Sequence, residues 1–148
     1  MHIVIQRVKN ARVITEDNEI AEIGKGLVLL VGFKKGDDGG SISQRVKKIL
    51  NLRIFEDSSG KMNLSILDVG GDILVVSNFT LVADLRKGNR PSFDTSLPPQ
   101  DAQILFEQFV SNLRLSGITV KTGAFGKQMI VSLANDGPVT FCLNEDTL

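Results

Sequence analysis

Short apolar segments separated by polar turns run through the chain and indicate strands more often than helices. Residues 3–8 alternate between apolar and polar side chains, and residues 12–15 predict the strand that pairs with them. Residues 27–33 and 73–76 are almost wholly apolar, which is typical of strands covered on both faces. With further strands at 20–23, 53–56, 62–66, 118–121, 129–133 and 139–143, the pattern predicts about eight or nine strands.

Only two segments have the period of an amphipathic helix. Ser41 is the expected N-cap of the first, whose apolar face is formed by Ile42, Val46, Ile49 and Leu50. The second follows Pro98 and places apolar side chains at helical spacing from 102 to 113, with Gly117 as its stop. The fold class we predict is α/β: one domain over residues 1–148, with mixed, mostly antiparallel sheets in two barrel-like layers and two helices packed on one side.

Charge and composition narrow the possible partners. Lys plus Arg and Asp plus Glu both number 17, so the chain has no overall positive field for wrapping long nucleic acids. A nucleic acid touched only at its tip remains compatible with that balance. No apolar run approaches the ~20 residues of a membrane helix, and the first residues do not resemble a signal peptide. We expect a cytoplasmic protein, because the chain's single cysteine cannot form an internal disulfide.

The chain has one histidine, His2, and one cysteine, Cys142. A single cysteine forms no internal disulfide, and we expect Cys142 to be a buried small hydrophobic residue. Triads that depend on histidine and zinc sites of ordinary ligand spacing are excluded. We expect no cofactor and no metal, so any catalysis must use backbone groups, hydroxyls and amides.

Two polar breaks follow strongly apolar runs, SNFTL at 77–81 and NDGPVT at 135–140. The Gly137-Pro138 step cannot extend a strand ladder, because proline has no N–H and its φ is fixed. Backbone carbonyls there are left to face something other than a neighbouring strand. By residue type alone, both breaks are also ordinary turns, since Ser, Asn, Gly and Pro are the residues that turns prefer.

Together these two segments resemble the paired signature of the D-aminoacyl-tRNA deacylases, also called D-tyrosyl-tRNA deacylases. The segments IQRV at 5–8, KGNRPSF at 87–93 and TGAFG at 122–126 resemble that family too, so the likeness spans the chain. The resemblance implies a homodimeric hydrolase that cleaves the ester between a D-amino acid, or glycine, and the 3′-terminal adenosine of tRNA. It implies no cofactor.

The resemblance also implies roles for particular residues. Gly137 and Pro138 would form a cis step that enters the partner subunit's active site and rejects an L side chain, with Arg7 locking it. The catalytic segment would be Ser77, Asn78, Phe79 and Thr80, whose backbone N–H groups near Phe79 and Thr80 are available to an oxyanion. Thr80 has no visible base beside it to make it a nucleophile.

Other positions have weaker implied roles. The amino acid or adenosine would contact Asn135, Phe125 and Met129, although the last two are equally suited to core packing. The CCA-end phosphates would meet Arg86, Lys87 and Arg90, which as solvated loop charges need no function. Asn78 replaces the family's usual glutamine and is one methylene shorter. That difference keeps open a second interpretation, a non-catalytic module of the same fold that binds the tRNA 3′ end.

Overall fold

The computed structural model describes all of residues 1–148. Along the chain its elements are β1 (His2–Thr15), β2 (Ile20–Ile23), β3 (Gly26–Gly32), α1 (Gly39–Asn51), β4 (Phe55–Glu56), β5 (Met62–Leu64), α2 (Ile66–Val69), β6 (Asp72–Ser77), the 3₁₀ turn η1 (Phe79–Val82), α3 (Pro99–Arg114), β7 (Val120–Thr122), β8 (Met129–Leu143) and the 3₁₀ turn η2 (Glu145–Thr147). None of the helices is long and apolar enough to cross a membrane.

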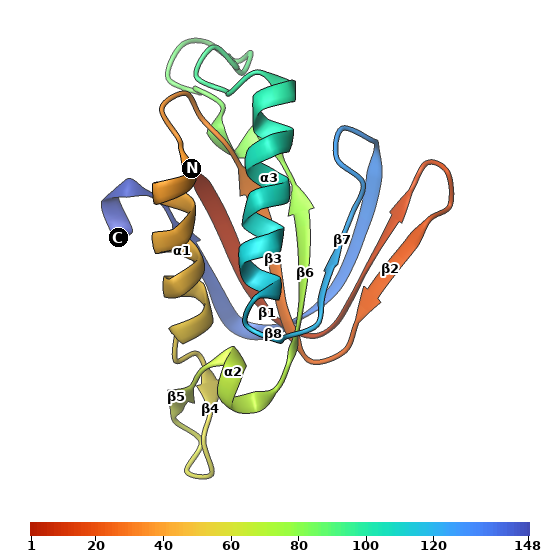
Figure 1. The fold of residues 1–148 in the computed structure, drawn as a ribbon, viewed down its shortest axis with the longest axis vertical. Helices are drawn as coiled ribbons and strands as arrows, with labels where there is room; N and C mark the ends of the chain where they lie inside the picture. The colour runs from red at the N-terminus through yellow and green to blue at the C-terminus, as the bar shows by residue number, and fades with distance from the viewer.

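The main sheet is mixed, and most of its strand pairs are antiparallel. β2 and β3 follow one another along one edge of β1, while β8 pairs with the opposite edge over nearly the whole length of β1. β3, β6 and β7 are parallel neighbours. Parallel strands need crossover connections, and α1 and α3 lie in these connections. Figure 1 shows the two helices side by side against the same side of the sheet.

The central strands are buried on both faces. In β3 and β6 the residues Leu27, Leu29, Ile73 and Val75 face the helices within the larger core cluster. Their neighbours Val28, Leu74 and Val76 belong to a second cluster on the opposite face. Since successive strand side chains point to opposite faces, the apolar runs fill both layers, and each buried Leu, Ile or Val contributes roughly 1.5–3 kcal/mol. The predicted fold class is confirmed.

Two pairs of predicted strands are single strands in the structure. Residues 2–15 form β1 without a turn, and residues 129–143 form β8, so the break at Gly137-Pro138 does not end a strand. The pairing of β1 with β8 instead shifts its register twice, between Gln6 and Val8 and between Val8 and Asn10 of β1. The first shift accommodates the polar break of β8, because Gln6 pairs with Thr140 and Val8 pairs with Asn135. A bulge lets the ladder continue past residues that cannot pair.

Three local predictions are wrong. Asp38, not Ser41, is the N-cap of α1, because the Asp38 carboxylate accepts from Ser41 N–H in a capping box. The strand predicted over 62–66 ends at Leu64, because Ser65 caps a helical turn over residues 66–69 by accepting from Asp68 N–H. Cys142 is exposed, because the outer part of β8 that carries it lies at the edge of the sheet.

Candidate functional site

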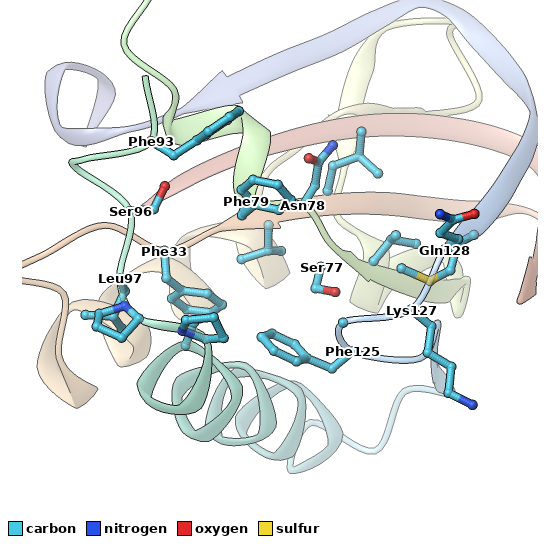
Figure 2. A pocket seen from close by; sticks show the side chains of 18 of the residues that line it. Phe33, Ser77, Asn78, Phe79, Phe93, Ser96, Leu97, Phe125, Lys127 and Gln128 are labelled. Carbon is cyan, nitrogen blue, oxygen red and sulfur yellow. The ribbon is translucent and has the colours of Figure 1, made fainter. Parts of the chain in front are cut away.

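A cavity of about 1150 Å³ opens where β3 and β6 end. Its floor is formed by Val31 and Val76 at the carboxyl ends of these parallel strands, and Ala102 of α3 closes one side. Residues 93, 94, 96–99 and 125–128 complete the rim (Figure 2). The carboxyl ends of parallel strands are where open α/β sheets bind ligands, because the loops there diverge. The location and the apolar lining identify this cavity as the candidate site.

The SNFTL segment lies at the wall of the cavity and is fixed from two sides. Asn78 N–H donates to Val31 O at 2.8 Å, which holds the segment against β3. The side chain of Asn78 caps η1: its Oδ1 accepts from Thr80 N–H at 3.1 Å and from the Thr80 hydroxyl at 2.5 Å. Gly32 permits this approach, because a Cβ on it would lie 2.7 Å from Asn78 O.

These contacts decide which groups of the segment can act on a ligand. Thr80 N–H is already engaged by Asn78, and the Thr80 hydroxyl donates to an amide oxygen, which is not a base. Thr80 also lies outside the cavity lining. Phe79 is the first residue of η1, so its N–H has no partner within that turn. The donor best suited to a developing oxyanion is therefore Phe79 N–H.

Aromatic rings stand on several sides of the cavity. Phe79 and Phe93 pack with their centroids 4.9 Å apart, and Phe79 is 61% exposed. Phe125 packs on Phe106 at 5.6 Å and faces the cavity, as does Phe33 (Figure 2). An exposed ring at the mouth of an apolar cavity is suited to a flat, partly polar ligand.

The Gly137-Pro138 step lies elsewhere, on an exposed bulge of β8. Gln6 pairs with Thr140 and Val8 pairs with Asn135, so residues 136–139 stand opposite Arg7 alone. The Gly137-Pro138 peptide is cis, and both residues are exposed. Neither lines the cavity of this chain. Both residues are therefore accessible to a ligand or to a second molecule.

Arg7 anchors the base of this bulge. Its side chain is buried and donates from Nη1 to Ile54 O at 2.7 Å and from Nε to Asp136 O at 3.2 Å. The same Nε lies 2.9 Å from Asp136 Oδ2, and Glu56 lies 3.7 Å from Nη2. In the amide orientation that satisfies both ends of its side chain, Asn135 Nδ2 donates to Arg7 O and Val139 O at 3.3 Å. The residues before and after the step are thus tied to β1.

The basic residues of the long loop are not part of the cavity. Arg86 pairs with Asp84 at 2.6 Å, and its hydrogen bonds hold the pKa of the Asp84 carboxyl well below its usual range. Lys87 and Arg90 are exposed and form no ion pair. The cations that line the cavity are Lys35 and Lys127.

The sequence-predicted residues therefore fall into three groups. The cavity brings together Ser77, Asn78, Phe79, Phe125 and Met129. The bulge holds Arg7, Asn135, Gly137 and Pro138, while Thr80, Arg86, Lys87 and Arg90 lie outside both.

Several residues outside the predicted site also line the cavity, among them Phe33, Lys35, Phe93, Leu97 and Ala102. The position of Phe33 and Lys35, directly after an apolar strand, was the available signal.

Comparisons with known proteins agree along the whole chain. Residues 4–144 match the family described as D-Tyr-tRNA(Tyr) deacylase. A protein of Thermodesulfovibrio yellowstonii named D-aminoacyl-tRNA deacylase is 52% identical over 95% of this chain and 97% of its own length. One of Pelobacter propionicus with the same name is 50% identical over 97% and 99%.

Two solved structures share the fold. One titled c-Myc DNA Unwinding Element Binding Protein superposes with a TM-score of 0.90 at 39% identity, covering 97% of this chain and 98% of the other. A second, titled as a probable eukaryotic D-amino acid tRNA deacylase, has a TM-score of 0.84 at 16% identity and covers 96% and 97%.

Proposed function

This chain belongs to the D-Tyr-tRNA(Tyr) deacylase family, and from that premise we propose that it rejects L-aminoacyl-tRNA at a gate made of backbone atoms. Membership makes it a hydrolase that acts on D-aminoacyl-tRNA in translation quality control. The mechanism has three parts: a cavity for the aminoacylated adenosine, an oxyanion donor at its wall, and a gate from a second subunit. Action on charged tRNA would place the protein in the cytoplasm.

Hydrolysis at this site would proceed without a side-chain nucleophile. An aminoacyl ester is already reactive, and water attacks its carbonyl with help from the vicinal 2′-hydroxyl of the terminal ribose. The protein then has to hold the ester and stabilise the negative charge that develops on the carbonyl oxygen, for which Phe79 N–H is placed. In support, Thr80 is hydrogen-bonded to Asn78 and no base lies beside it.

The gate would be formed by Gly137 and Pro138 of a partner subunit in a homodimer. The observation that carries this proposal is their position: both are exposed, neither lines the chain's own cavity, and Arg7 and Asn135 fix the backbone around them. Backbone carbonyls of the step would accept from the substrate's α-amino group. Such contacts read the chiral centre and leave the side chain free, so different D-amino acids, and glycine mischarged on tRNA-Ala, would be accepted.

A deacylation assay tests whether the protein hydrolyses D-aminoacyl-tRNA and rejects L-aminoacyl-tRNA. The purified chain should release D-Tyr and glycine from charged tRNA and spare L-Tyr-tRNA. Equal rates on the two enantiomers would refute the gate. Tight binding of D-Tyr-tRNA without release would instead support the second interpretation, a non-catalytic 3′-end-binding module, which Asn78 in place of glutamine keeps open.

Subunit exchange tests the shared site. A Pro138→Ala variant would displace the backbone carbonyls that hold the substrate's α-amino group, and a Ser77→Leu variant would fill the cavity, so each homodimer should hydrolyse D-Tyr-tRNA far more slowly than wild type. Random mixing at equal amounts gives hybrids with one complete site, and about a quarter of wild-type activity should return. Activity that stays at the level of the unmixed variants would show that gate and cavity do not come from different subunits.

A further inference from the structure

Two cationic side chains line the cavity, and only one of them is unpaired. Lys127 forms an ion pair with Asp17. Lys35 is exposed and belongs to none of the ion pairs of the chain. An anion that enters the cavity could therefore bind Lys35 without breaking an existing pair.

The backbone under Lys35 is held in place. Lys35 N–H donates to Thr95 O at 2.9 Å, and Lys34 forms a bridge with Ser96 on the same segment. Asp37 closes the turn, because its Oδ2 accepts from Lys34 N–H at 2.7 Å. The side chain of Lys35 thus starts from a fixed point of the rim, while its long stem can still adjust to a ligand.

Lys35 belongs to the end of the cavity formed by Phe33 and Leu97. Figure 2 shows this end opposite Phe125 and Lys127, with Ser77 between them. The one acidic side chain that lines the cavity, Asp94, accepts from the Ser92 hydroxyl at 2.9 Å and is in no ion pair with Lys35. The two ends therefore differ: one offers a free ammonium group, and the other offers a lysine already neutralised by a carboxylate.

We propose that Lys35 binds the phosphate that joins the terminal adenosine to the preceding nucleotide of the tRNA. This rests on the proposed function, in which the aminoacylated adenosine occupies the cavity. The terminal nucleoside with its amino acid carries one anionic attachment, the 5′-phosphodiester, and that group must leave through the rim. Lys35 is the rim cation free to meet it, whereas Arg86, Lys87 and Arg90 lie outside the cavity and could reach only other parts of the tRNA.

Two substrates that differ only in the phosphate test this role. D-Tyr-tRNA carries the phosphodiester, and 3′-O-D-tyrosyl-adenosine does not. In Lys35→Ala the KM for D-Tyr-tRNA should rise about tenfold, the order expected for a hydrogen bond to a charged group, with kcat little changed. The kinetics on 3′-O-D-tyrosyl-adenosine should not change. The dependence of log KM on log salt for the tRNA should become shallower by about 0.7, one phosphate contact to a single strand.

Lys34→Ala is the matched control. It removes the same charge from the neighbouring residue, but Lys34 pairs with Glu145 and does not line the cavity, so both substrates should behave as with wild type. Lys35→Arg should restore most of the affinity for the tRNA. An equal loss on both substrates in Lys35→Ala, or no loss on the tRNA, would overturn the proposal.

Binding without turnover separates this inference from the proposed function. The trinucleotide CCA and free adenosine are titrated against wild type and Lys35→Ala. Weaker binding of CCA alone supports the phosphate contact even if charged tRNA is not hydrolysed. Unchanged binding of CCA refutes it even if hydrolysis is normal.

Discussion

Replacing Arg7 should both destabilise the fold and loosen the selection of the substrate. In Arg7→Met the apolar stem is kept and the charged donors are lost. Ile54 O loses a 2.7 Å hydrogen bond from a buried cation, a loss of roughly 1.5–3 kcal/mol. The Asp136 carboxylate loses its ion pair, but it is 32% exposed, so this costs about 1 kcal/mol.

The expected total is about 3 kcal/mol, which for a domain of this size corresponds to a fall in Tm of about 9 °C. Thermal and urea unfolding of both proteins measure it. Asp136→Ala should cost only about 1 kcal/mol, because the Asp136 carbonyl and Ile54 O keep their partner. In a double-mutant cycle the two changes should couple by about 1 kcal/mol, since Arg7 and Asp136 are in contact.

Selectivity is then measured at a temperature where every variant is folded. Arg7 holds the chain on either side of the bulge, so its loss should lower the ratio of D-Tyr-tRNA to L-Tyr-tRNA hydrolysis. A normal Tm in Arg7→Met would refute the energetic argument. A normal D/L ratio in a folded Arg7→Met protein would refute the link between Arg7 and the gate.

Three further predictions follow from contacts around the cavity. Thr80→Ala should lower kcat by less than about tenfold, because the Thr80 hydroxyl only donates to Asn78; complete loss of turnover in a folded variant would restore the nucleophile hypothesis. Gly32→Ala should lower the free energy of unfolding by about 1–3 kcal/mol and lower kcat, because the added Cβ meets the rigid Asn78 carbonyl. Gly123→Ala should destabilise the fold less, because its Cβ meets the flexible end of the Met129 side chain; calorimetry and the deacylation assay compare the two variants. Arg86→Ala should leave KM for the tRNA nearly unchanged from about pH 5 to 9. In wild type the hydrogen bonds from Arg86 lower the pKa of Asp84, so the carboxylate stays charged and paired with Arg86 across this range, and Arg86 is not free to bind a phosphate. A KM that rises in the variant within that range would contradict this assignment.

Local patterns were sufficient for the architecture. The uninterrupted apolar runs at 27–33 and 73–76 indicated central strands, and the helical spacing from 102 to 113 indicated α3, because burial on two faces or on one stripe leaves a direct trace in the sequence. The ends of elements were less well predicted. Asp38 rather than Ser41 caps α1, and Ser65 starts a helical turn, since capping depends on which of several neighbouring polar side chains reaches the free N–H groups.

The functional site, like the fold, was predicted in part from local sequence patterns and decided in part by long-range packing. Motif by motif, the sequence was enough to indicate the family and to single out residues 77–81 and 135–140, because short polar breaks after apolar runs are visible in one dimension. Only the tertiary structure decided that the second break continues as a bulge opposite Arg7, and that it lies outside the cavity formed by the first. Strand register and the meeting of distant loops depend on long-range packing, which also brings Lys35 to the rim beside residues 95–97 and leaves Arg86 paired with Asp84.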